Sequence, residues 1–180
     1  IAPPIKHLET HLKSLSDLEK TNRNYILAMD LYETKLDAMN SCYNTLAAYP
    51  EASGNPNLAR ARTYYSDSYD SINQLRARIS GDASVINRTR TLITETSSKI
   101  KESLSSEEIL NLFNSYQEEI DSEDLPGIMA GALRDGEYIT FKGEVDQSDV
   151  EPGPLFNYNN ACTEAINAIE AARRAQNAGA

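Results

Sequence analysis

The sequence predicts a mainly α-helical protein built on a long antiparallel helical hairpin. Apolar residues recur at steps of three and four over residues 4–48 and again, once per heptad, over residues 58–103. This is the spacing of a coiled-coil stripe on a packed helix. The two segments are similar in length and are joined by residues 49–57, so they should fold back on each other. Two shorter helical patterns later in the chain are expected to complete a four-helix bundle.

The first helix is expected over residues 4–48, between Pro3 and Pro4 at its start and Pro50 beyond its end. One polar residue, Asn22, interrupts its stripe, and a single polar residue there can fix the register of pairing at some cost in stability. The stripe comprises Ile5, Leu8, Leu12, Leu15, Leu18, Asn22, Tyr25, Met29, Tyr32, Leu36, Met39, Tyr43 and Leu46.

The second helix is expected over residues 58–103, where one apolar residue returns at every seventh position. These residues are Leu58, Tyr65, Ile72, Ile79, Ile86, Ile93 and Ile100. The companion positions of the stripe are smaller and more polar, which lets a neighbouring helix approach closely. Thr89 and Thr96 are among them. With Asn22, they are candidates for a polar core position, a register device or a small polar cavity.

Two shorter helices are expected in the second half of the chain. Residues 105–121 begin with Ser105 and carry Glu108 three positions later, the pattern of a helix N-cap with a capping box. Residues 160–177 are rich in alanine, which favours helix and tight packing. Each helix has one apolar side with which to cover the hairpin.

A β-hairpin insertion is expected between these helices, within residues 125–145. Asp135 and Gly136 lie between "MAGAL" and "EYITF", which is the pattern of a tight turn joining two strands. A lone hairpin is marginally stable, so it should lie on the bundle or join another chain. Four side chains in this hairpin and the loop after it are candidate contacts for a partner: Tyr138, Phe141, Leu155 and Phe156.

The expected organisation therefore has three parts. The hairpin occupies residues 1–105, a short helix with an acidic β-hairpin and loop occupies 106–158, and a helix packed on the bundle occupies 159–180. Acidic residues are concentrated in 107–151, and the whole chain has a formal net charge of −10. This charge argues against nucleic acid as a partner, because phosphate binding needs a basic surface. No run of eighteen apolar residues is present, so no transmembrane segment is expected.

The two histidines raise the possibility of a metal site. His7 and His11 are four residues apart and share a helix face, but Leu8 stands where the zinc-protease motif has its glutamate. We interpret both histidines as surface residues beside the buried stripe. No phosphate loop, serine elbow or Cys-x-x-Cys pair is present either. We therefore expect no catalytic residue, no metal and no cofactor.

Cys42 and Cys162 leave two alternatives open. They form either one disulfide in an oxidising compartment or two buried thiols in a reducing one. A bond between them would close a loop of about 120 residues and stabilise the fold by about 3–5 kcal/mol. Because the chain begins at Ile1 and not at methionine, something has been removed upstream, which slightly favours an exported or extracytoplasmic protein.

The leading functional hypothesis is a non-catalytic helical module for structure or protein interaction. Nearly all the informative positions serve helix packing, and long helical hairpins commonly associate with protein partners or with themselves. The alternative is an extracytoplasmic ligand-sensing helical domain of a receptor, favoured by polar residues in the expected core. Neither hypothesis requires catalytic activity, and we expect that the chain is not an enzyme.

Overall fold

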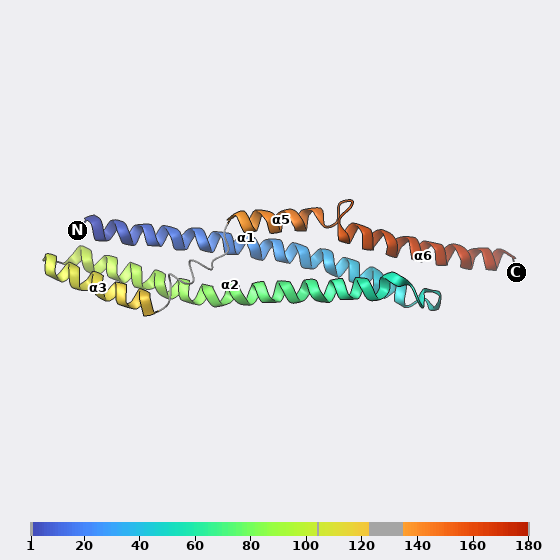
Figure 1. Ribbon diagram of the computed structural model, residues 1–180, viewed down its shortest axis with the longest axis horizontal. Coiled ribbons are helices and arrows are strands. Elements are labelled where there is room, and N and C mark those ends of the chain that lie inside the picture. The colour runs from blue at the N-terminus through green and yellow to red at the C-terminus, as the bar shows by residue number, and fades with distance from the viewer. Residues whose placement is uncertain (1, 104, 123–134, 180) are drawn as a thin grey trace. The chain divides into compact units, whose positions relative to one another are not determined.

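The protein, described by a computed structural model over residues 2–103, 105–122 and 135–179, is helical almost throughout (Figure 1). Its elements are α1 (Ala2–Ala47), the short 3-10 helix η1 (Pro50–Ala52), α2 (Pro56–Glu102), α3 (Ser106–Ser122), α5 (Asp135–Gln147) and α6 (Pro154–Gly179). No strand occurs among the described residues. The predicted all-α class is therefore confirmed.

The chain divides into two compact units, and both long helices contribute to each. Unit 1 consists of Ile1–Asn24 and Leu75–Tyr138, and unit 2 of Tyr25–Gln74 and Ile139–Ala180. Each unit therefore contains one segment of α1 and one of α2. Its remaining helices pack against that pair.

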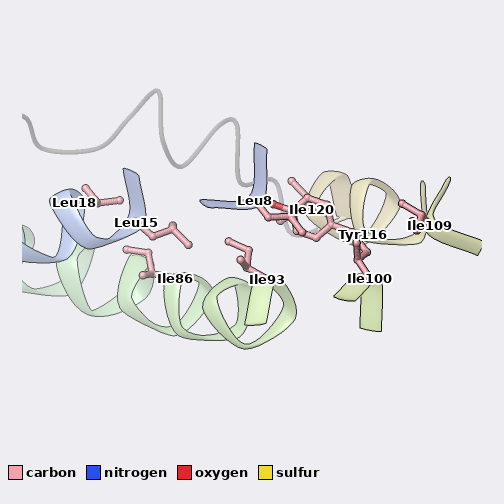
Figure 2. Packing of buried hydrophobic residues seen from close by; sticks show 9 residues of the cluster. All are labelled: Leu8, Leu15, Leu18, Ile86, Ile93, Ile100, Ile109, Tyr116 and Ile120. Atoms are coloured by element: carbon pink, nitrogen blue, oxygen red, sulfur yellow. The ribbon is translucent and has the colours of Figure 1, made fainter. Parts of the chain in front are cut away.

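The core of unit 1 is formed by the two predicted stripes together with α3. Figure 2 shows leucines of α1 facing isoleucines of α2, with residues of α3 beside them. The cluster comprises Leu8, Leu15, Leu18, Ile86, Ile93, Ile100, Ile109, Tyr116 and Ile120. Full burial of one such aliphatic side chain stabilises a fold by about 1.5–3 kcal/mol. The start of α3 was correctly predicted, since the Glu108 amide donates to Ser105 Oγ over 3.2 Å.

The turn between the long helices lies in unit 2 and has a clear local cause. Gly54 adopts φ +85°, a conformation that residues with a Cβ rarely take. Asn55 Oδ1 then accepts a hydrogen bond of 2.9 Å from the Asn57 amide and caps α2. Pro56 occupies the first helical position, where the missing N–H costs nothing. The chain therefore reverses, and α2 runs antiparallel to α1 within this unit (Figure 1).

In unit 2, which includes α5 from Ile139 onward and all of α6, these two helices run along α1 in the same direction as α1. Contacts between them pair increasing residue numbers: Lys35 with Asp149, Tyr43 with Tyr158, Tyr49 with Glu170, and Glu51 with Arg173. The buried side chains of this unit include Leu36, Met39, Tyr43, Leu46, Ala61, Ile72, Val145, Leu155 and Cys162. The α5–α6 segment thus covers the second half of α1.

The predicted four-helix bundle is wrong in arrangement. Helix α3 packs in unit 1, whereas α5 and α6 belong to unit 2 and follow one another along α1. The four helices therefore do not share one compact unit. Sequence patterns locate helices, but they do not say which length of a long hairpin a shorter helix will cover.

The predicted β-hairpin is also wrong. Asp135–Gln147 form α5, so "DGEYITF" is helical, while the other expected strand lies outside the described residues. The helical spacing places Phe141, Val145 and Ser148 on one side, and that side is buried or half-buried. Burying this side against the rest of unit 2 overrides the weak local preference for a turn.

Candidate functional site

The corner between α5 and α6 is held by hydrogen bonds that converge on Ser148. Its backbone carbonyl accepts from the amides of Leu155 at 2.7 Å and Phe156 at 3.0 Å, which lie in the first turn of α6. Its hydroxyl donates to the Val145 carbonyl over 2.6 Å. Ser148 itself is buried. The corner therefore satisfies backbone groups at both helix ends, which are otherwise left without partners.

Gly153 is required in this corner because the backbone passes too close for a side chain. A Cβ on this residue would lie 2.1 Å from the carbonyl oxygen of Gln147 and 2.5 Å from that of Ser148. Both are backbone atoms, which cannot move aside as the end of a flexible side chain can. The close approach brings the start of α6 back against the end of α5.

A cavity of about 430 Å³ lies between this corner and the long helices of unit 2. Tyr32 contributes from α1, Tyr64 from α2, and Phe141 from α5. The described residues of the lining are Tyr32, Tyr64, Phe141, Glu144, Val145, Gln147, Ser148, Val150, Pro152, Gly153 and Pro154. Its volume lies within the range of about 300–1,000 Å³ that is typical of small-molecule sites. We call it the tyrosine pocket.

The aromatic walls of the tyrosine pocket are supported by further rings. The hydroxyls of Tyr32 and Tyr64 are 2.5 Å apart and share a hydrogen bond. The Tyr64 ring lies 5.4 Å from that of Tyr158, and the Phe141 ring lies 5.4 Å from that of Tyr25. These spacings are those of favourable aromatic pairs. Neighbouring aromatic side chains therefore hold the walls of the pocket in place.

Electrostatically, the tyrosine pocket is neutral to acidic. Burial, together with the hydrogen bond shared with Tyr32, raises the pKa of the Tyr64 phenol well above its usual 10, so this hydroxyl stays protonated. Glu144 is the one side chain with a formal charge among the described residues of the lining. Lys35 lies near the corner, but its ammonium donates to the Val145 carbonyl at 3.1 Å and pairs with Asp149.

The four predicted partner contacts have different positions. Phe141 lines the tyrosine pocket, and Leu155 is fully buried, so Leu155 offers no surface to a partner. Tyr138 and Phe156 are each partly exposed. The sequence did not identify Tyr32 and Tyr64 as pocket residues. Spacing rules apply within one helix, and they do not reveal which residues of α1, α2 and α5 meet in the folded chain.

The predicted polar positions all lie in unit 1 and are buried: Asn22, Thr89 and Thr96. The Thr89 hydroxyl has no hydrogen-bond partner among the described residues. Nearby in sequence, Glu19 and Arg90 approach to 2.6 Å as an ion pair between α1 and α2, although their alignment does not make a hydrogen bond. Polar side chains therefore occupy buried positions in unit 1.

His7 and His11 lie beside each other on α1, and both contact α3. The rings of His7 and Phe113 lie 5.4 Å apart, and His11 Nδ1 is 2.5 Å from the Tyr116 hydroxyl. Burial, followed by the nearby His7, lowers the pKa of His11 below its usual 6.5. Burial raises the pKa of Tyr116 to about 12. Within the described ranges, no group of three or more His, Cys, Asp or Glu is placed to hold a metal ion.

Cys42 of α1 and Cys162 of α6 are joined by a disulfide, with their Cα atoms 6.5 Å apart. The bond lies in unit 2 and ties the last helix to the first. It is reinforced by the Tyr43 hydroxyl, which donates to the Tyr158 carbonyl over 3.0 Å. These contacts hold the first half of α6 against α1, close to the wall of the tyrosine pocket.

Comparisons of the chain with protein-family models, with curated proteins and with solved structures find no match. Among its described helices, none has both the length and the apolarity needed to cross a membrane.

Proposed function

We propose that this chain is a non-catalytic helical module that works by binding protein, most simply another copy of itself. The observation that supports this is an exposed apolar surface on α1 in unit 2. Leu27 is 67% exposed, Leu31 39% and Ile26 36%. Leu27 and Leu31 are four residues apart and so share a helix face. Adjacent exposed apolar side chains of this kind are common where a helix meets a partner.

The heptad spacing of α1 and α2 supports the same proposal. Within each unit, the stripe residues of the two helices are buried or partly buried. Such packing leaves the outer faces of the helices available for association, as in coiled coils that assemble further. We therefore propose coiled-coil packing of α1 on α2, with Ile26, Leu27 and Leu31 as the outward surface.

Sedimentation velocity over a wide range of protein concentration tests self-association. We expect the wild-type chain to shift to a larger species as concentration rises, and the double variant Leu27→Glu with Leu31→Glu to stay monomeric. Leu110→Glu is a matched control, because Leu110 is also exposed, at 58%, but lies on α3 in unit 1. A wild-type chain that remains monomeric at every concentration would refute self-association.

A second candidate function is ligand sensing by a helical domain, and the tyrosine pocket favours it. A pre-formed, mostly apolar cavity with a few polar atoms is the usual form of a small-molecule site. The Cys42–Cys162 bond supports an oxidising, extracytoplasmic setting for such a domain, because disulfides persist there. Thiol labelling of protein from its native source, with and without reductant, tests this setting. Free thiols before reduction would count against it.

A further inference from the structure

We propose that the tyrosine pocket binds an organic cation: an ammonium group carried on an apolar body. This inference rests on the second candidate function and specifies the class of its ligand. It follows from three properties of the pocket, which are the faces of its rings, the sign of its charge and the hydrogen-bonding groups that it presents.

The rings provide the first argument. Tyr32, Tyr64 and Phe141 line the pocket from three different helices. The face of an aromatic ring is electron-rich and attracts a cation by about 0.5–1 kcal/mol at exposed sites, and by more where water is excluded. Phe141 is held by Tyr25, and Tyr64 by Tyr158, so these rings require little reorganisation on binding.

The charge of the lining provides the second argument. Glu144 supplies a carboxylate, and no lysine or arginine is among the described residues of the lining. The ammonium of Lys35 is already paired with Asp149 at 2.9 Å. A ligand carboxylate would therefore meet Glu144 without a compensating cation, whereas a ligand ammonium would be attracted to it.

The hydroxyl groups provide the third argument. Tyr32 and Tyr64 share one hydrogen bond, and the Tyr32 oxygen also lies 3.5 Å from Ser68 Oγ. Of the two phenol protons, one is used between the rings, so the pair keeps one proton to donate and lone pairs that can accept. The N–H groups of a ligand ammonium can donate to these lone pairs.

Three indole compounds of similar size test the class of ligand: tryptamine, which is an ammonium ion at neutral pH, tryptophol, which is neutral, and indole-3-propionate, which is an anion. The chain contains no tryptophan, so indole fluorescence reports the probe without background from the protein. Anisotropy titrations of each probe with the full chain yield its dissociation constant. We expect tryptamine to bind most tightly and indole-3-propionate most weakly.

Variants of lining residues test whether the expected order of probe affinities arises in the tyrosine pocket. Glu144→Gln should weaken tryptamine binding by about fivefold or less, as expected for a partly exposed charge pair, and leave tryptophol binding unchanged. Asp70→Asn is the matched control, since Asp70 is an exposed carboxylate of unit 2 outside the lining. Phe141→Leu keeps the apolar volume but removes the ring face, so tryptamine should lose about two- to fivefold.

Val150→Lys tests whether the preference of the pocket for a cation over an anion can be reversed. Val150 lines the pocket and is 50% exposed, so a lysine there should be tolerated by the fold while placing a positive charge at the opening. We expect this variant to bind indole-3-propionate better than tryptamine. Denaturant unfolding of each variant distinguishes weaker ligand binding from unfolding of the protein.

The possible failures are distinguishable. If tryptophol or indole-3-propionate binds as tightly as tryptamine, and Val150→Lys changes their binding, the pocket is a ligand site but the cation assignment is overturned. If none of the three probes binds the folded chain, both this inference and the ligand-sensing function are overturned for this pocket. If tryptamine binds equally well to Glu144→Gln, Phe141→Leu and Val150→Lys, it binds elsewhere, and the inference fails.

Discussion

Lys35 of α1 and Asp149, just beyond the end of α5, form an ion pair with 2.9 Å between Nζ and Oδ1. The same ammonium donates at 3.1 Å to the Val145 carbonyl near the end of α5, which also accepts from the Ser148 amide and hydroxyl. The Lys35 side chain is only 18% exposed. One residue of the first helix therefore positions the corner that forms one wall of the tyrosine pocket.

Replacement of Lys35 by methionine should destabilise unit 2. The variant keeps the aliphatic stem but removes the charged donor, and such a hydrogen bond contributes about 1.5–3 kcal/mol before screening by solvent. We expect a loss of about 1–2 kcal/mol in the free energy of unfolding, measured by urea denaturation. Lys142→Met is the control, because Lys142 pairs with Asp146 within one exposed helix, a pair contributing about 0.5 kcal/mol or less. Equal losses in both variants would show that the bridge from α1 has no special role.

Gly153→Ala should destabilise the α5–α6 corner. The new Cβ would fall 2.1 Å from a backbone oxygen, so either the corner or the start of α6 must move. We expect a loss of about 2 kcal/mol or more in unfolding free energy, together with weaker probe binding in the tyrosine pocket.

Gly143→Ala is the matched substitution within α5, where a Cβ would meet nothing within 4 Å. Alanine is favoured over glycine in a helix by about 1 kcal/mol, so this variant should be more stable than the wild type. Thermal and urea unfolding of both variants check that Gly153→Ala lowers the free energy of unfolding and Gly143→Ala raises it. A Gly153→Ala protein as stable as Gly143→Ala would contradict the close approach.

Reduction of the disulfide should lower the stability of unit 2. Cys42 and Cys162 are separated by 120 residues in sequence, and cross-links that close long loops stabilise by about 3–5 kcal/mol in the chain-entropy picture. We expect the urea midpoint to fall when reductant is added. The double variant Cys42→Ser with Cys162→Ser should unfold at the same lower midpoint with or without reductant. An unchanged midpoint for the wild type on reduction would be inconsistent with this bond.

Acid should destabilise unit 1 through His11. Its pKa in the folded protein is below 6.5, chiefly because the ring is partly buried and secondly because of His7. As the pH falls below about 6.5, the unfolded chain binds a proton more readily than the native one, so stability is lost progressively down to the native pKa. Above that window the stability is fully present.

Urea denaturation from about pH 8 to about pH 5 checks this dependence. His11→Gln removes the titrating group, so its stability should change less with pH than that of the wild type. His7→Gln removes only the neighbouring charge and should reduce the dependence without abolishing it. Identical pH profiles for wild type and His11→Gln would rule out His11 as the source.

The helices could be predicted because their causes are local. Isoleucine at every seventh position predicts one apolar helix face, and in α2 that face is buried from Ile72 to Ile100. Ser105 and Glu108 likewise mark the start of α3 by a hydrogen bond across three residues. Such patterns need no information from distant parts of the chain.

The segment Asp135–Gln147 could not be assigned correctly because its local signals conflict. Asp135 and Gly136 favour a turn, but the spacing of Phe141 and Val145 suits a helix once unit 2 provides a surface to pack against. A residue pair that prefers a turn by a fraction of a kcal/mol is overridden by the burial of one large side chain, which contributes about 1.5–3 kcal/mol.

By itself, the sequence determined the all-α class, both long buried stripes and the N-cap of α3, since helix periodicity and capping act over three to seven residues. Only the tertiary structure decided that α3 packs in one unit and α5–α6 in the other, and that Tyr32, Tyr64 and Phe141 surround one pocket. The physical reason is that these contacts join residues up to about a hundred positions apart. Their geometry depends on how whole helices pack, which no local pattern encodes.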